Sequence, residues 1–116
     1  MKHSIGKSFA IGTAQEIFTV PNGFIAVVYM VFITNTSGST SSYDMSWRHA
    51  HDASHVIRFA YGKSLGSGTS DQFTNGELVM KEGDRLTITN SGAMDVIVTF
   101  DLIKSLPLYA FDNEYA

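Results

Sequence analysis

Three of the four histidines of this chain stand within the short stretch RHAHDASHV at 48–56. One residue separates His49 from His51, so on an extended strand both imidazoles point to the same face. A His-x-His pair of this kind can place two nitrogen ligands on one metal ion, and His55 follows closely enough to return from a turn as a third. Metal binding is therefore the first chemistry to weigh.

The spacing partly resembles the first motif of the cupins, in which a His-x-His pair is followed by a glutamate and then by a glycine. His55 stands in the place of the glutamate, and Gly62 falls in the place of the glycine. The second cupin motif is missing, because no histidine follows His55 and Pro107 is the only later proline. Asp52 adjoins His51 directly, which does not give the spacing of a non-haem iron triad.

The alternative is a polar turn at a loop or subunit contact, whose imidazoles titrate near neutral pH. We predict no metal and no cofactor, and we keep a cupin-like metal-dependent enzyme as the less favoured alternative.

Other catalytic patterns are incomplete. GKS at 62–64 lacks the earlier glycine of a phosphate loop, and no serine stands in a G-x-S-x-G elbow. Asp95 and Asp101 are about 20 Å apart on one strand, too far for a paired acid and base. The chain is therefore predicted not to be an enzyme.

Composition limits the other functions. The chain has 116 residues, a net charge of −3 and no cysteine, which favours one domain that is stable without disulfides. Its eight lysines and arginines form no run, so nucleic acid is not an expected partner. A fold could gather these charges on one face, but nothing in the sequence indicates it. The longest apolar run, 24–33, is about half a membrane span, so we expect no membrane partner.

The elements that must position these residues are predicted to be strands. Turn-forming clusters such as PNG at 21–23 and KEGD at 81–84 alternate with runs rich in Val, Ile, Phe, Tyr and Thr. This pattern is typical of an antiparallel β-sandwich or barrel. We therefore predict a single all-β domain, an antiparallel β-sandwich, at 15–103, between an N-terminal arm with a first short strand at 1–14 and a C-terminal arm at 104–116. The predicted strands are 8–11, 15–20, 24–34, 43–50, 55–61, 77–80, 85–90 and 95–103.

The strand at 24–34 is unusual because neither of its faces carries a charged residue. Strict alternation puts Ile25, Val27, Tyr29, Val31 and Ile33 on one face, and Phe24, Ala26, Val28, Met30 and Phe32 on the other. Either the strand is central and covered on both sides, or its outer face meets another subunit. We expect symmetric association through this strand or its sheet.

The C-terminal segment at 104–116 is also apolar, and Pro107 prevents it from continuing as a central strand. It is either a tail that folds back on its own core or an arm that lies on a neighbouring protein. Trp47 fits a core or contact position, and could also stack on a sugar or a base. The predicted partner-binding residues are Leu106, Pro107, Leu108, Tyr109, Phe111, Trp47, His49 and His51.

Between about 15 and 103, the chain resembles small virion proteins of tailed bacteriophages. The resemblance rests on the Thr-Val-Pro-x-Gly turn at 19–23, the Asn-Thr-Ser at 35–37 and the hairpin pattern at 78–88. It implies a β-sandwich or jelly-roll fold and a structural protein of the virion, made in the host cytoplasm and without catalytic residues. Capsid decoration (cement) is the first choice, as a homo-oligomer, with a trimer favoured, that binds the major capsid protein or other virion proteins. A head-to-tail, neck or fibre component that binds a receptor or glycan, through Trp47 and the loops at 35–42 and 62–71, is the alternative.

Overall fold

The computed structural model describes residues 2–50, 56–73 and 78–105. Within these ranges the chain forms nine β-strands and no helix. The strands are β1 (Lys2–Phe9), β2 (Gly12–Thr19), β3 (Phe24–Asn35), β4 (Ser41–Arg48), β5 (Val56–Leu65), β6 (Ser70–Phe73), β7 (Leu78–Met80), β8 (Arg85–Asn90) and β9 (Met94–Lys104).

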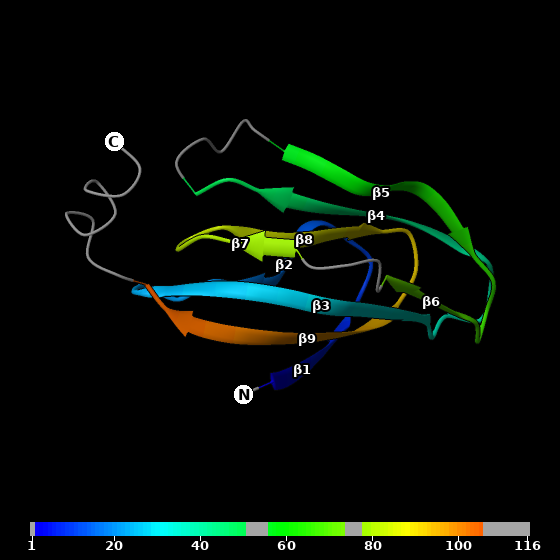
Figure 1. Ribbon diagram of the computed structural model, residues 1–116. Helices are drawn as coiled ribbons and strands as arrows, with labels where there is room; N and C mark the ends of the chain where they lie inside the picture. The colour runs from blue at the N-terminus through cyan, green and yellow to red at the C-terminus, as the bar shows by residue number, and fades with distance from the viewer. Residues whose placement is uncertain (1, 51–55, 74–77, 106–116) are drawn as a thin grey trace.

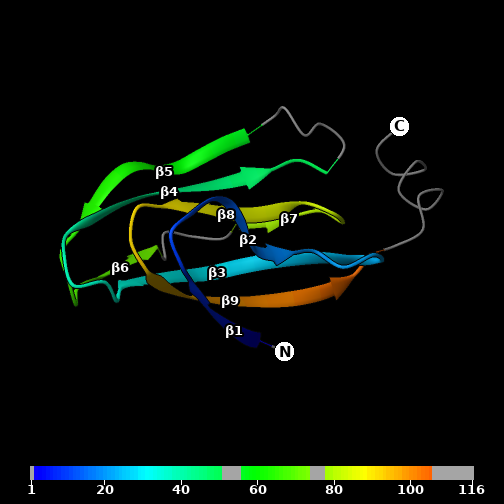
Figure 2. The ribbon, with the colours of Figure 1, turned by 180° about the vertical axis from the view of Figure 1, so that it is seen from behind.

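The strands make two antiparallel sheets that pack against each other, as Figure 1 shows. Sheet A has the order β1-β9-β3-β6, and β7 also pairs with β3; sheet B has the order β2-β8-β4-β5. This confirms the predicted all-β sandwich, and the order is that of a jelly roll with β7 added to one sheet. Strand β5 lies at one edge of the molecule and β1 at the opposite edge, in both views (Figures 1 and 2).

One apolar core fills the space between the sheets. The predicted alternation of β8 and β9 is confirmed, because Leu86 and Ile88 are fully buried, as are Val96 and Val98. Met45 of β4 is fully buried opposite Ile88, so neighbouring strands contribute to the same layer. Burial of this inward-facing set is the main source of stability in a chain without disulfides.

Strand β3 is central, with β9 on one side and β6 and β7 on the other. Its register shifts between Val28 and Met30, so Tyr29 is an extra residue in a β-bulge. The bulge moves Val31 and Ile33 onto the inward face together with Val28. The predicted division of faces was therefore wrong beyond the bulge, since strict alternation cannot show an inserted residue.

Two further differences concern weakly apolar edge strands. Residues expected to form an arm with a strand only at 8–11 instead form β1, which pairs with β9 along its whole length. Strand β6 falls partly within the stretch at 62–71, which was expected to be a loop. Edge strands cover little of the core, so their sequences need few apolar residues: in β1 only Ile5 and Phe9 pack on the core.

Candidate functional site

Trp47 and His49, two of the predicted contact residues, lie near the end of β4 beside Asp84. The Trp47 ring packs partly buried against the core, and its Nε1 donates a hydrogen bond of 3.2 Å to Asp84 Oδ2. The Nδ1 atom of His49 is 4.0 Å from Asp84 Oδ1, and the His49 and Trp47 rings are 5.0 Å apart. These contacts connect β4 to the turn that precedes β8.

Asp84 is buried, with 1% of its surface exposed, and its carboxylate accepts further backbone hydrogen bonds. The amide of Ala50 donates to Oδ1 and the amide of Lys81 to Oδ2, each at 3.0 Å. Both oxygens therefore have hydrogen-bond donors from this chain. Asp84 closes the turn at 81–84 and ties the chain after β4 to it, which is a structural role for a buried carboxylate.

Several predicted site residues lie outside the residues that the structure describes. They are His51, Asp52, His55, Leu106, Pro107, Leu108, Tyr109 and Phe111. Among the described residues, no group of three or more His, Cys, Asp or Glu side chains could hold a metal ion. The metal hypothesis and the arm hypothesis both remain predictions. The last described residue, Ser105, donates its amide to the Gly23 carbonyl at 2.9 Å, so the described part of the chain ends beside the turn before β3.

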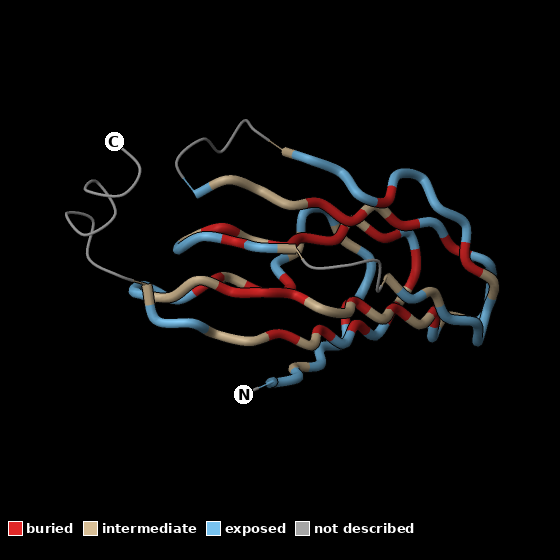
Figure 3. The backbone as a smooth tube through the Cα atoms, viewed as in Figure 1, coloured by how far each residue is buried: buried red, intermediate tan, exposed pale blue. Residues whose placement is uncertain are grey.

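On the outer face of sheet A, apolar side chains extend beyond β3, the strand for which sequence reasoning had expected them. The pairing register places the outward-facing residues of β3, β9 and β7 side by side. We call this set the apolar face; it consists of Ile25, Val27, Tyr29, Met30, Phe32, Val79, Ile97 and Ile103. Val79, Ile97 and Ile103 are 52%, 42% and 53% exposed. In Figure 3, exposed and intermediate residues occur between buried residues along these strands.

Polar residues of β9 interrupt the apolar face, since Thr99 stands opposite Met30 and Asp101 opposite Val27. Tyr29 donates its hydroxyl to Asp101 Oδ2 at 2.9 Å, and Lys2 Nζ lies 4.6 Å above the Tyr29 ring. The hydrogen bond from Tyr29 holds the pKa of the Asp101 carboxyl below its ordinary value, and the charge of Lys2 adds to this. These contacts connect the edge strand β1 to the central strands of the sheet.

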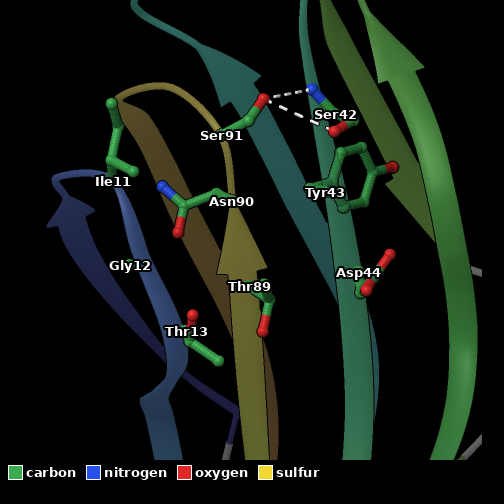
Figure 4. Close-up of a pocket in the computed structure, with 9 residues that line it drawn as sticks. All are labelled: Ile11, Gly12, Thr13, Ser42, Tyr43, Asp44, Thr89, Asn90 and Ser91. Atoms are coloured by element: carbon green, nitrogen blue, oxygen red, sulfur yellow. Dashed lines mark hydrogen bonds between the residues drawn. The ribbon is translucent and has the colours of Figure 1, made fainter.

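The outer face of sheet B has the opposite chemistry, because hydroxyl and charged side chains cover it. Near one end is a hollow of about 190 Å³, drawn in Figure 4. Ser91 Oγ accepts a 2.8 Å hydrogen bond from the Ser42 amide in its wall, and Asp44 accepts one from the Gly62 amide. Its lining residues are Ile11, Gly12, Thr13, Ser42, Tyr43, Asp44, Thr89, Asn90 and Ser91.

Sequence reasoning did not find the residues of the apolar face or of the hollow that come together only through strand pairing. Val79, Ile97 and Ile103 are scattered along the chain, and only the register brings them beside β3. The alternation of β9 did contain a signal, because the outward set of that strand includes two isoleucines among its polar residues. The sequence contained no signal for the hollow on sheet B, because its walls come from three separate segments of the chain, at 11–13, 42–44 and 89–91.

No protein-family model matches the chain, and no curated protein matches it as a relative. Among the described residues, no helix is long and apolar enough to cross a membrane. The fold class and the two contrasting outer faces are therefore the basis for a functional proposal.

Proposed function

We propose that this chain is a non-enzymatic structural protein of a virion, most simply a capsid decoration protein that acts by symmetric protein–protein contacts. The observation that carries the proposal is the apolar face on sheet A. A solvent face of a sandwich is ordinarily polar, and exposed apolar side chains gathered on such a face are typical of an interaction site. Jelly rolls occur in viral capsid proteins, but also in lectins and cupins, so the fold alone does not choose between them.

The apolar face suits association with further copies of the same chain. Its most exposed members, Val79, Ile97 and Ile103, come from two strands on either side of β3. Burial of such residues releases roughly 25 cal/mol per Å² of apolar surface, and the gain repeats at each symmetry-related contact. A trimer is our favoured assembly, with the major capsid protein or another virion protein as the larger partner. The many weak contacts of a symmetric assembly add to a strong attachment.

The virion assignment requires that a phage genome encodes the chain, and it is tested on particles of that phage. Density-purified particles should contain the chain at a copy number in a fixed ratio to the major capsid protein. Particles assembled without it should lose their genome at a lower temperature or after milder chelation than complete particles. The chain's absence from purified particles would refute the assignment, whatever its assembly state in solution.

A second candidate is a neck or fibre component that binds a glycan, and the hollow on sheet B favours it. Hydroxyl side chains and the Asp44 carboxylate surround this hollow, which are groups that hydrogen-bond sugars. A glycan array with the purified chain checks this function. A specific signal that disappears in Thr89→Val, while Thr99→Val on sheet A keeps it, would support the second candidate over the first.

A further inference from the structure

All three arginines of the chain lie on the outer face of sheet B. In the register of the sheet, Arg48 of β4 stands directly opposite Arg85 of β8. Arg58 of β5 stands opposite Ser46, which also faces Thr87 on its other side. Residues paired in this way share a face, so the three guanidinium groups project from three adjacent strands. We call these three residues the arginine patch.

The side-chain contacts agree with this placement. Arg48 donates from Nε to Thr87 Oγ1 at 3.2 Å, so its side chain lies across the outer face toward β8. The guanidinium of Arg58 lies 5.2 Å from the centre of the Tyr61 ring. Within the described residues, none of the three arginines makes an ion pair with a carboxylate. The patch therefore keeps its guanidinium charge available to a partner.

The Arg48–Arg85 pair has an energetic consequence. Like charges directly opposite each other on neighbouring strands destabilise a sheet. The carboxylate that the register brings nearest is Glu16 of β2, and it stands opposite Thr87, not opposite either arginine. An anion placed over the pair would relieve the repulsion, and an arginine fork binds a carboxylate with two parallel hydrogen bonds.

We propose that the arginine patch is a docking surface for a protein segment rich in carboxylates. This inference rests on the proposed contact function: the apolar face would bind further copies of the chain, and the opposite face would attach the assembly to an acidic partner. Tyr61 of β5, which is 75% exposed, lies beside Arg58 in the patch. Arginine and tyrosine are both enriched at protein–protein hot spots.

The distribution of the other charges favours a protein over a nucleic acid. A phosphate backbone needs a continuous cationic track. Here Asp44 lies on the same face as Arg48, about 13 Å away along β4 at about 3.3 Å per residue. Lys2 and Lys104 belong to strands of sheet A, and Lys63 lies 3.6 Å from Asp71. The positive patch is therefore short and ends at carboxylates, which suits a limited acidic epitope.

The probe for the test is a fluorescent poly-L-glutamate peptide, and its binding is measured by anisotropy at low salt. The test variant combines Arg48→Gln, Arg58→Gln and Arg85→Gln. A matched variant with Lys2→Gln, Lys7→Gln and Lys104→Gln removes the same amount of positive charge from sheet A. We expect the arginine variant to bind at least about tenfold more weakly than the unchanged chain, and the lysine variant to bind nearly as well.

Three results would overturn the inference: equal losses in both variants, no binding by the unchanged chain, or tighter binding of a single-stranded oligonucleotide than of poly-L-glutamate. Arg58→Gln alone provides a second variant, because Arg58 is exposed and its substitution leaves the Arg48–Thr87 hydrogen bond intact. It should lose part of the binding and none of the folding.

Self-association is recorded on the same samples, so that the two proposals fail separately. If the arginine variant assembles normally and still binds the peptide fully, only the docking surface is wrong. If the unchanged chain binds the peptide but remains a monomer, the docking surface stands and the proposed self-association is wrong.

Discussion

The hydroxyl of Tyr43 donates a 2.7 Å hydrogen bond to Asp71 and so joins the two sheets across the sandwich. Tyr43 belongs to β4 of sheet B and Asp71 to β6 of sheet A, and Lys63 of β5 lies 3.6 Å from the same carboxylate oxygen. Burial raises the pKa of the Tyr43 hydroxyl well above its ordinary range, and the hydrogen bond to Asp71 and its charge raise it further. The phenol therefore stays protonated at neutral pH and donates this hydrogen bond.

Replacement of Tyr43 with phenylalanine should lower the free energy of unfolding by about 1–2 kcal/mol, because the charge-assisted hydrogen bond is lost at a buried position. Urea denaturation measures the change. Tyr61→Phe is the matched control, since Tyr61 is 75% exposed, and its effect should stay within about 0.5 kcal/mol. Equal effects from the two substitutions would show that the bridge between the sheets contributes little.

Asp84→Ala should be among the most destabilising single substitutions, at about 2–5 kcal/mol. It leaves the Trp47 indole and the amides of Ala50 and Lys81 without their acceptor at a buried site. Thermal unfolding followed by circular dichroism provides the measurement. The control is Asp95→Ala at an exposed position of β9, which should change the melting temperature little. A small effect of Asp84→Ala would contradict the structural role given to this carboxylate.

Gly83→Ala should destabilise the turn before β8. Gly83 has a φ of +82°, which a residue with a side chain rarely adopts, and an added Cβ would lie 2.8 Å from the Cβ of Ala50. We expect a loss of about 1–3 kcal/mol in chemical denaturation. Gly38→Ala adds a methyl group where nothing lies within 4 Å and should be nearly neutral. If the two alanine variants are equally stable, the turn does not have this conformation.

Tyr29→Phe should raise the pKa of Asp101 toward its ordinary value, because the hydrogen bond from Tyr29 is the largest cause of its depression. A carboxyl whose pKa is lower in the folded state stabilises the fold above its unfolded pKa. This contribution disappears as the pH falls through the folded pKa. The difference in stability between the chain and Tyr29→Phe should therefore shrink as the solution is acidified through that range. Carboxyl-carbon NMR titration gives the pKa directly, and an unchanged value in Tyr29→Phe would refute the assignment.

The fold class could be predicted from the sequence because turn clusters and alternating strands are local signals. The alternation of Leu86 with Ile88 was enough to orient β8. The bulge at Tyr29 could not be predicted, because an inserted residue leaves no mark in an unbroken apolar run. The cross-strand pair of Arg48 and Arg85 was equally hidden, since a register set by long-range pairing decides which distant residues meet.

The candidate site was predicted in part. Sequence reasoning selected β3 as a contact strand, and the structure adds Val79, Ile97 and Ile103 from its neighbours. It also drew attention to His49, whose described contacts are with Trp47 and with Asp84, a carboxylate that the histidine pattern did not indicate. The contacts of Trp47 and His49 with Asp84 could not be predicted, because the turn at 81–84 is more than thirty residues away in the sequence.

Sedimentation velocity of the unchanged chain beside Ile97→Glu is the most direct test of the central claim that the apolar face of sheet A mediates self-association. At micromolar concentration the unchanged chain should sediment as a multiple of its 12.7 kDa mass, most simply as a trimer, and Ile97→Glu should be a folded monomer. Ile11→Glu makes the same change at a residue that is 71% exposed outside the apolar face, and it should assemble normally. A monomeric unchanged chain, or an Ile97→Glu variant that assembles as well as Ile11→Glu, would contradict the claim.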